Sequence, residues 1–326
     1  MTNSIRTGII GTGFAAQRRA EALTEDDRAQ LVAVAGHRPE SLNEFCQTYS
    51  VKGYDSPKAL IANADIDLAV ICNINAQHGD LAQAALEAGK HVVVEYPLSL
   101  NPEQAQYLIH FAKLQNQLLH VEHIELLGGL HNAIRQWLPE IGEVFYARYS
   151  TINPKRPAPR KWSYHKKLFG FPFSGAVSRF NRFTDLFGRV NSVSCYTRYW
   201  DRDTPEEYVA CLNNAQLRFQ NGLFAEITYG KGEVFWHTDR SFELHGDQGT
   251  LLFDGNEGKL IRGEETTPIE VGSRRGLFAK DTTAVLDYLT ENKPLYVQAH
   301  ASSYATRVAD AARMSAESGK TVVLND

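Results

Sequence analysis

The sequence predicts an α/β protein with an N-terminal Rossmann-type domain, a doubly wound parallel sheet. A C-terminal α+β domain with a large, mostly antiparallel sheet follows. Two observations predict this fold class. Apolar β-branched runs alternate with helical segments through the first part of the 326-residue chain, which is typical of a parallel sheet with right-handed crossovers. From about residue 143, strand-like runs are separated by turns. We therefore predict domains at residues 1–122 and 123–326.

In the first domain, strand and helix signals follow each other in order. Strands are predicted at residues 7–11, 31–35, 67–72, 91–95 and 118–121, with a short strand beginning at 54. Helices are predicted at residues 15–23, 39–49 and 102–114. One further helix is predicted to begin at residue 57, and another, after the strand at 67–72, to end at residue 88. Pro39 suits a first helical turn, Ser56 an N-cap, and Gly89 the position after a C-cap.

The second domain combines a sheet with bracketing helices. Strands are predicted at residues 144–151, 192–200, 208–219, 223–229, 241–245 and 250–254. Asn221-Gly222, between two of these runs, is a strong hairpin signal. Helices are predicted at residues 124–136, 283–290 and 301–318, and the basic, aromatic segment 154–167 is predicted to be a loop.

Composition excludes several classes of protein. The 34 Lys and Arg residues against 38 Asp and Glu give a net charge of −4, so we expect no nucleic-acid partner. No apolar run approaches the roughly 18 residues of a membrane span, and residues 1–6 show no signal-peptide pattern. The four cysteines have no metal-binding spacing. We expect a cytoplasmic protein with reduced cysteines and neither a membrane partner nor a bound metal.

A glycine motif follows the first predicted strand. Gly11-Thr12-Gly13-Phe14-Ala15-Ala16 is a GxGxxA form of the dinucleotide fingerprint, placed between a strand and a helix as the fingerprint requires. Gly11 allows the tight turn and Gly13 lets the backbone approach a pyrophosphate at the helix N-terminus. We therefore predict that Gly11, Thr12, Gly13, Phe14 and Ala15 contact a dinucleotide.

The end of the second strand indicates which dinucleotide binds. NAD-selective domains place an acidic residue there to bond the ribose 2′-hydroxyl. Here Ala35 is followed by Gly36-His37-Arg38, and the guanidinium of Arg38 suits a 2′-phosphate. We predict that His37 and Arg38 bind this phosphate, which favours NADPH over NADH. The alternative is that Arg38 is a solvated residue at a helix start.

Further motifs resemble a known superfamily. The segments VICNINAQH (70–78) and ALEAGKHV (85–92), with Glu95-Tyr96-Pro97, resemble the glucose–fructose oxidoreductase and inositol dehydrogenase superfamily. The resemblance implies a Rossmann domain joined to an open-faced sheet domain, with the active site between them. It also implies further cofactor contacts, from Asn73, Ile74, Asn75, His78 and Glu95.

One position departs from the superfamily pattern. Sugar-oxidising members carry Glu-Lys-Pro, in which the lysine acts at the substrate hydroxyl, whereas this chain has Tyr96 there. A tyrosine with a pKa near 10 is a poor base at neutral pH. Oxidation of a sugar by the usual lysine route is therefore in doubt.

Glu-Tyr-Pro occurs in the biliverdin reductase branch, and three further segments resemble its cyanobacterial members. They are HVEHIELL (120–127), GFPFSGAVSR (170–179) and FTDLFG (183–188). The resemblance implies NADPH-dependent hydride transfer to the central methine carbon of biliverdin, a linear tetrapyrrole of heme degradation, which gives bilirubin. It also implies that Arg179 is catalytic, by aiding protonation or by stabilising charge.

Several other residues are candidates for the same site. We predict a catalytic contribution from Tyr96, which stacks on the substrate or donates a hydrogen bond. The predicted substrate contacts are Tyr96, Glu122, His123, Glu125, Phe173, Arg179 and Arg182. Cations also gather between residues 155 and 182 among aromatic residues, a pattern that suits a flat dianionic pigment. Each of these residues also has a plain structural interpretation, as core or as a solvated charge.

Two other functions remain open at this point. One is an NADP-dependent dehydrogenase or reductase of a sugar or small carbonyl compound, and the other is a non-catalytic dinucleotide-binding redox sensor. We expect a small-molecule substrate, and either a monomer or a homodimer formed through the sheet face.

Overall fold

The computed structural model describes residues 4–62 and 65–325. Residues 1–3, on which the prediction about a signal peptide partly rests, lie outside the described residues. By their contacts the residues form two compact units, one running to Ile124 and including Arg275–Ser303, the other comprising Glu125–Arg274 and the chain from Tyr304. The predicted domain boundary stays a prediction. The return of residues 275–303 to the first unit was not foreseen.

The first unit contains a six-stranded sheet whose strands are all parallel. Their order is β3-β2-β1-β4-β5-β6, which is the order of the doubly wound dinucleotide-binding fold, and this confirms the predicted Rossmann domain. The strands are β1 (Ile5–Ile10), β2 (Ala29–Ala35), β3 (Lys52–Tyr54), β4 (Leu68–Ile71), β5 (His91–Val94) and β6 (Leu119–Val121). The helices are α1 (Phe14–Thr24), α2 (Pro39–Tyr49), α3 (Pro57–Ile61), α4 (His78–Glu87), α5 (Pro102–Leu114) and α10 (Leu277–Glu291).

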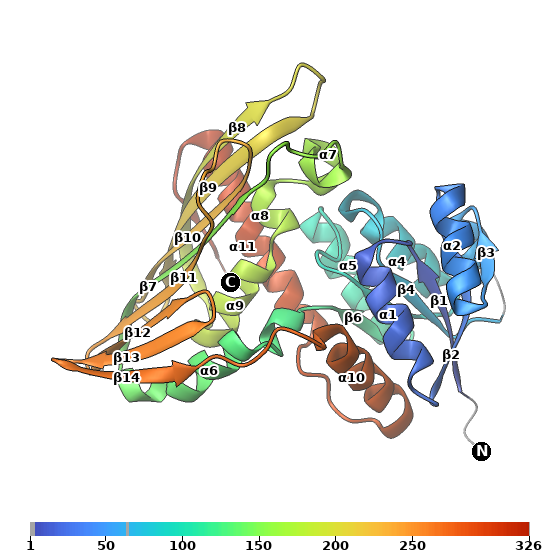
Figure 1. The fold of residues 1–326 in the computed structure, drawn as a ribbon, viewed down its shortest axis with the longest axis horizontal. Coiled ribbons are helices and arrows are strands. Elements are labelled where there is room, and N and C mark those ends of the chain that lie inside the picture. Colours follow the sequence, from blue (N-terminus) through green and yellow to red (C-terminus); the bar gives the residue numbers. More distant parts are fainter. Residues whose placement is uncertain (1–3, 63–64, 326) are drawn as a thin grey trace. The chain divides into compact units, whose positions relative to one another are not determined.

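Helices cover both faces of this sheet (Figure 1). Side chains from α3, α4 and α5 pack with Ile10 in one apolar core, and side chains from α1, α2 and α10 pack with Ile9 in the other. Because successive strand residues point to opposite faces, a strand buried on both sides must be apolar throughout. All four residues of β4 are accordingly buried.

The second unit contains a nine-stranded sheet in the order β14-β13-β12-β11-β7-β10-β9-β8-β15. The strands are β7 (Val144–Pro154), β8 (Val190–Asp201), β9 (Tyr208–Phe219), β10 (Phe224–Gly232), β11 (Asp239–Gly246), β12 (Gly249–Asp254), β13 (Glu257–Arg262), β14 (Glu265–Glu270) and β15 (Val322–Val323). Among the described strands of this sheet, only β7 and β10 pair in parallel, so the predicted mostly antiparallel sheet is confirmed.

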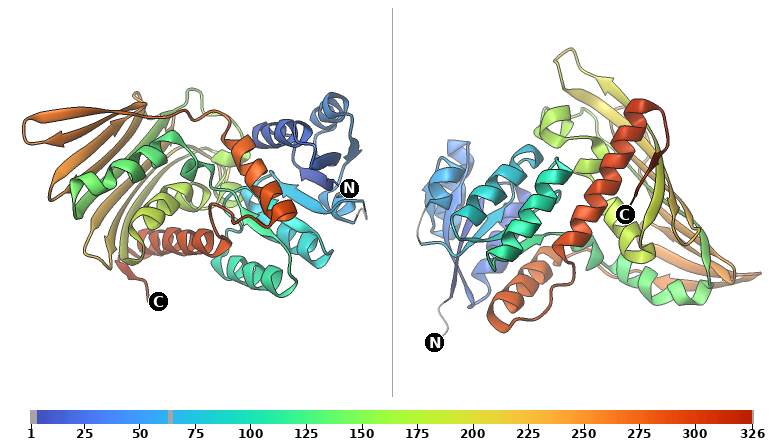
Figure 2. Two further views of the ribbon diagram at one scale, coloured as in Figure 1. Left: turned by 90° about the horizontal axis from the view of Figure 1, so that it is seen from below. Right: turned by 180° about the vertical axis from the view of Figure 1, so that it is seen from behind.

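Helices lie on one face of this sheet (Figure 2). They include α6 (Gly129–Trp137), α9 (Ser178–Phe187) and α11 (Ala299–Ser318), with the short α7 (Lys166–Phe169) and α8 (Pro172–Gly175) nearby in the chain. Phe183 of α9 stacks on Phe242 of β11, with ring centroids 5.2 Å apart. No described helix of the unit lies on the opposite face. Tyr146 is three residues from Tyr149 of β7, which contacts Arg182 of α9, so its side chain points to this opposite face, where it contacts Phe224 and His245.

Two sequence predictions needed correction in this unit, and three strands were missed. The helix predicted at residues 124–136 is instead a short 3-10 turn, Ile124–Leu126, followed by α6. The strand predicted to end at 229 continues to Gly232. The strands β13 and β14 were missed because they are largely polar, and β15 because it has only two residues; β14 contains Pro268, which an edge strand tolerates.

Candidate functional site

The glycine turn between β1 and α1 has the geometry of a phosphate-binding loop. Gly11 has φ +123°, and a Cβ atom there would lie 2.5 Å from the carbonyl oxygen of Cys72. Gly13 is the N-cap of α1, and the space that its Cβ would occupy is open. The first-turn N–H groups of α1 therefore face a site that a phosphate can approach closely. Ala16 is fully buried against the sheet, as the motif requires.

The other residues of the motif lie at the edge of this turn. Thr12 is half-buried, and its methyl group packs on Gly36. A Cβ atom at position 36 would lie only 2.9 Å from that methyl carbon. Phe14 is exposed and meets Phe278 of the returning segment edge to face, with centroids 6.0 Å apart. Ala15 is half-buried. At the end of β2, His37 and Arg38 are exposed, so Arg38 has its guanidinium available to a ligand.

The turn after β4 is joined to the turn after β5 by His78. The Nδ1–H of His78 donates to the carbonyl oxygen of Pro97 at 2.8 Å, and Nε2 lies 3.3 Å from the carbonyl oxygen of Asn73. Burial lowers the pKa of His78, which favours the neutral ring. Nδ2 of Asn73 donates to Oε1 of Gln77 at 2.7 Å, and no donor among the described residues bonds the buried Oδ1 of Asn73. In the same turn, Ile74 is half-buried and Asn75 is buried.

Glu95, at the end of β5, belongs to a buried charged network. Its Oε1 accepts from Nε and Nη2 of Arg19 at 3.2 and 3.1 Å. Burial raises the pKa of Glu95, and the nearby Arg19 opposes that shift. Arg19 also donates to Asp281 and Thr282 of α10. Neither Arg19 nor Asp281 was among the predicted site residues.

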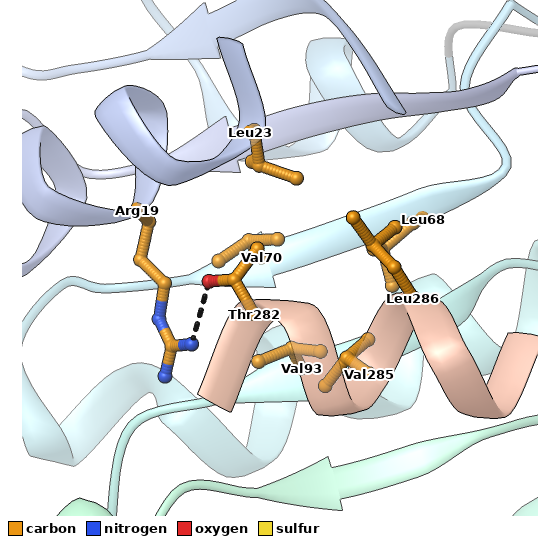
Figure 3. Close-up of a pocket in the computed structure, with 8 residues that line it drawn as sticks. All are labelled: Arg19, Leu23, Leu68, Val70, Val93, Thr282, Val285 and Leu286. Atoms are coloured by element: carbon orange, nitrogen blue, oxygen red, sulfur yellow. Dashed lines mark hydrogen bonds between the residues drawn. The ribbon is translucent and has the colours of Figure 1, made fainter. Parts of the chain in front are cut away.

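A small apolar pocket lies beside this network (Figure 3). Its lining comes from Arg19, Leu23, Leu68, Val70, Val93, Thr282, Val285 and Leu286. Its volume of about 10 Å³ is roughly the space that one water molecule needs, so it cannot accept a dinucleotide or a pigment.

Tyr96 is stacked on His123. The two rings lie 5.5 Å apart and almost parallel, at 6°. Tyr96 is half-buried, whereas Glu122 and His123 have 1% and 0% of their surface exposed. The structure therefore brings Glu95, Tyr96 and His123 together; Glu95 and Tyr96 are half-buried, and His123 is buried. In the second unit, Glu125 is half-buried, and no group among the described residues bonds its buried Oε2.

Arg179 lies on the side of α9 that faces the sheet. Its Nε donates to the hydroxyl of Thr151 on β7 at 2.9 Å, and its guanidinium carbon lies 4.6 Å from the ring centre of Tyr229 on β10. Arg182, one turn later, is 2% exposed over the ring of Tyr149. No acceptor among the described residues bonds its Nε or Nη1. The two arginines share a helix face, as predicted.

Phe173 lies in the core of the second unit. It is fully buried and meets Phe180 edge to face, with ring centroids 4.9 Å apart. A residue with no exposed surface cannot touch a ligand without a rearrangement. Its predicted substrate contact therefore has no support in its placement.

A buried lysine that the sequence analysis did not single out lies beside Arg179. Lys231 on β10 is 7% exposed, and its Nζ donates to the carbonyl oxygen of Ser163. Aromatic rings surround the ammonium group, with Nζ 3.7 Å from the centre of Phe169 and 4.8 Å from that of Tyr164. Burial, with a smaller contribution from the charge of Arg179, lowers the pKa of Lys231 to about 8. Both cations also face the ring of Tyr229.

Much of the basic stretch before α9 is neutralised by nearby acids. Arg160 pairs with Glu207 at 3.4 Å, Lys166 with Asp201 at 2.8 Å, and Lys167 with Glu206 at 3.1 Å. These cations therefore contribute less positive charge to a ligand surface than the sequence indicates. Beside the rings of Tyr149 and Tyr229, Arg182 and Lys231 are buried and Arg179 is half-buried.

No group of three or more His, Cys, Asp and Glu side chains among the described residues is arranged to hold a metal ion. No helix in the described part of the chain is long and apolar enough to cross a membrane.

The strand order and the glycine turn make the first unit a nicotinamide-dinucleotide domain of an oxidoreductase. Residues 5–123 match the oxidoreductase family domain with an NAD-binding Rossmann fold, and residues 139–324 match the C-terminal alpha/beta domain of the same family. The chain belongs to this GFO/IDH/MocA oxidoreductase family.

Known relatives include reductases of two kinds. The crystal structure of biliverdin reductase from Synechocystis sp. PCC 6803, in complex with biliverdin and NADP+, is 55% identical, covers 96% of this chain and 99% of its own, and has a TM-score of 0.95. Mouse biliverdin reductase A is 28% identical over 84% of this chain and 82% of its own. A dTDP-3,4-didehydro-2,6-dideoxy-alpha-D-glucose 3-reductase of Actinomadura kijaniata is 27% identical over 76% of this chain and 74% of its own.

Proposed function

We propose that this enzyme reduces biliverdin to bilirubin with NADPH. The observation that carries the proposal is the 55% identity, over 96% of the chain, to a biliverdin reductase crystallised with biliverdin and NADP+. Tyr96 in place of the superfamily lysine also favours a pigment over a sugar. The balanced reaction consumes NADPH, one proton and biliverdin, and gives NADP+ and bilirubin.

The cofactor end of the proposal rests on the first unit. The open space at Gly13 and the exposed first turn of α1 fit a pyrophosphate, and the exposed Arg38 fits a 2′-phosphate. When bound, NADPH supplies the hydride. Asn73 and Asn75, in the turn after β4, and Glu95 after β5 are the predicted contacts nearer the nicotinamide.

The substrate end of the proposal rests on Arg179. Hydride addition at the central methine carbon places negative charge on the pyrrole system until a nitrogen is protonated. A guanidinium held by Thr151 and Tyr229 stabilises that charge, because arginine keeps its proton and its positive charge in proteins. Tyr96, stacked on His123, offers a flat ring and a hydroxyl to the substrate. We expect the protein to be either a monomer or a homodimer formed through the exposed sheet face.

A spectroscopic assay tests the proposed reaction. Purified protein is mixed with NADPH and biliverdin, and we expect the long-wavelength band of biliverdin to decay while a bilirubin-like band appears. The same protein is assayed with NADPH and dTDP-keto sugars, which we expect to remain unreduced. A folded protein that binds NADPH yet leaves biliverdin unchanged over a broad pH range refutes the proposal. Reduction of a dTDP-keto sugar but not of biliverdin would instead support a sugar reductase.

Arg38 gives a prediction about cofactor selectivity. Arg38→Ala should raise the Kd for NADPH about 10- to 100-fold, because a charge-assisted hydrogen bond contributes about 1.5–3 kcal/mol, and should leave the Kd for NADH nearly unchanged. Titration of the intrinsic fluorescence with each cofactor measures both constants. Arg18→Ala, on the exposed side of α1, is the control; equal loss of affinity for NADPH and NADH in Arg38→Ala would contradict the assignment.

Lys231 gives a prediction about pH. Because its pKa in the folded protein is about 8, below its usual 10.5, the ammonium loses its proton as pH rises through 8. We expect kcat of the wild type to fall there, as the positive charge beside Arg179 is lost. Lys231→Met should have a low kcat without this step, and Lys231→Arg should move the fall to higher pH. A wild-type step near pH 8 that persists in Lys231→Met would contradict the assignment.

The same shift predicts a change in stability. Between pH 8 and 10.5 the unfolded chain binds more protons at Lys231 than the folded chain does. Burying the charged ammonium therefore lowers the free energy of unfolding by its full amount below pH 8, and this loss of stability vanishes towards pH 10.5. Lys231→Met should therefore raise the free energy of unfolding at pH 7 by about 1–3 kcal/mol. Urea unfolding at pH 7 and at pH 10.5 measures this gain, which should be lost at the higher pH.

A further inference from the structure

Tyr96 is held from two directions by a closed ring of buried contacts in the first unit. The residue before it, Glu95, is bound by Arg19, and its own ring is stacked on His123. Both supports lead to one carboxylate, that of Asp281. This residue is fully buried on α10, in the segment that returns to the first unit late in the chain.

The first arm of the ring runs from Asp281 through Arg19 to Glu95. Nη1 of Arg19 donates to Oδ2 of Asp281, while Nε and Nη2 donate to Glu95. Arg19 is 1% exposed, and Thr282 adds a further acceptor at 3.2 Å (Figure 3). Burial alone would lower the pKa of Arg19, but the two carboxylates raise it well above its usual value. The guanidinium is therefore a permanent cation that fixes the start of the Glu95-Tyr96-Pro97 turn.

The second arm runs from Asp281 through Tyr296 to His123. The hydroxyl of Tyr296 donates to Oδ1 of Asp281 at 2.6 Å and accepts from the backbone N–H of His123 at 3.1 Å. Nε2 of His123 lies 2.8 Å from the hydroxyl of Ser302, which sets the plane of the ring that stacks on Tyr96. Nε2 of His120 also bonds Oδ1 of Asp281, at 2.7 Å.

The carboxylate at the centre of the ring remains charged. Burial would raise the pKa of Asp281, but Arg19 and His120 outweigh it and lower the pKa below its usual range. A charged carboxylate offers lone pairs on both oxygens, and here Oδ1 accepts two hydrogen bonds and Oδ2 accepts that of Arg19. An asparagine has only one acceptor oxygen, so it would turn an NH2 group towards the donors of one arm.

We propose that Asp281 is a positioning residue that holds the side chain of Tyr96 through these two arms. The contribution of Tyr96 to biliverdin reduction rests on the proposed function, whereas the positioning of its ring does not. The inference also gives a reason for the return of residues 275–303 to the dinucleotide domain, since this segment supplies Asp281, Thr282, Tyr296 and Ser302.

A fluorine label on Tyr96 tests the positioning directly. With 3-fluorotyrosine incorporated at position 96 only, we expect one narrow ¹⁹F resonance in the otherwise wild-type protein. Asp281→Asn should shift and broaden this resonance, and Tyr296→Phe, which removes only the second arm, should shift it less. Asp287→Asn, on the same helix but paired with Arg28 and Lys293 at the surface, should leave it unchanged. An unchanged resonance in folded Tyr296→Phe and Asp281→Asn would overturn the proposal.

Kinetics give a second measure that a merely structural role would not produce. In Asp281→Asn we expect kcat for biliverdin to fall on the order of 10- to 100-fold, as for a misplaced reacting group, while the KM for NADPH changes little. If Asp281→Asn does not fold, Tyr296→Phe carries both tests. If the wild type does not reduce biliverdin, the proposed function fails, and the ¹⁹F spectra still decide whether Asp281 positions Tyr96.

Discussion

Arg179→Ala is expected to lower kcat for biliverdin reduction by about 10²- to 10³-fold, the usual cost of losing a group that stabilises developing charge. Arg179 is held between Thr151 and Tyr229, so its guanidinium is fixed before the substrate arrives and needs no reorganisation during the reaction. Because Arg179 belongs to the second unit and the glycine turn to the first, the Kd for NADPH should stay within a factor of about two. Steady-state rates at saturating NADPH, with a separate cofactor titration, measure the two effects.

Two further variants distinguish charge from geometry at this position. Arg179→Lys keeps a positive charge but loses the planar fork, and we expect its rate to lie between those of the wild type and Arg179→Ala. Arg189→Ala removes an exposed arginine that stacks on Tyr304, and it should be as active as the wild type. Normal turnover in Arg179→Ala would remove this residue from the mechanism.

Gly11→Ala is expected to abolish NADPH binding in the accessible concentration range. The new Cβ would lie 2.5 Å from the carbonyl oxygen of Cys72, and the φ of +123° is one that residues with a side chain rarely adopt. The chain must therefore move the loop that is proposed to receive the pyrophosphate, and we expect a rise of at least about 100-fold in the Kd for NADPH. Fluorescence titration measures it, and the melting temperature reports the accompanying loss of stability.

Gly89→Ala is the matched control. Gly89 also has a positive φ, of +77°, but nothing lies within 4 Å of the position of a Cβ atom there. It should cost about 1 kcal/mol of stability from backbone strain and leave the Kd for NADPH unchanged. Equal Kd values for Gly11→Ala and the wild type would contradict the phosphate-loop assignment.

Local patterns were enough to predict the first sheet and its dinucleotide turn. The β-branched runs define strands buried on both faces, and Gly11 and Gly13 stand in a fixed relation to the strand before them and the helix after them. The hairpin at Asn221-Gly222 was predicted for the same reason, since its turn chemistry is local; β9 and β10 pair antiparallel around it. Arg179 was found through resemblance and not through any local pattern.

The residues that the sequence analysis missed depend on distant partners. Asp281 pairs with Arg19 across 262 positions of the chain, and the helix predicted to begin at residue 283 left it in a loop. Lys231 follows the predicted end of its strand, and a single lysine in a polar stretch carries no sign that four aromatic rings will surround it. Only tertiary packing turns these charges into buried groups.

The most direct test of the proposed function follows the hydrogen that is transferred. Biliverdin is reduced by the purified enzyme with NADPH deuterated at C4 of the nicotinamide, on each face in turn, and the product is examined by mass spectrometry and NMR. We predict bilirubin that carries one deuterium at the central methine carbon from one of the two labelled cofactors. Deuterium at another carbon, or no bilirubin at all from a folded protein that binds NADPH, would contradict the proposal.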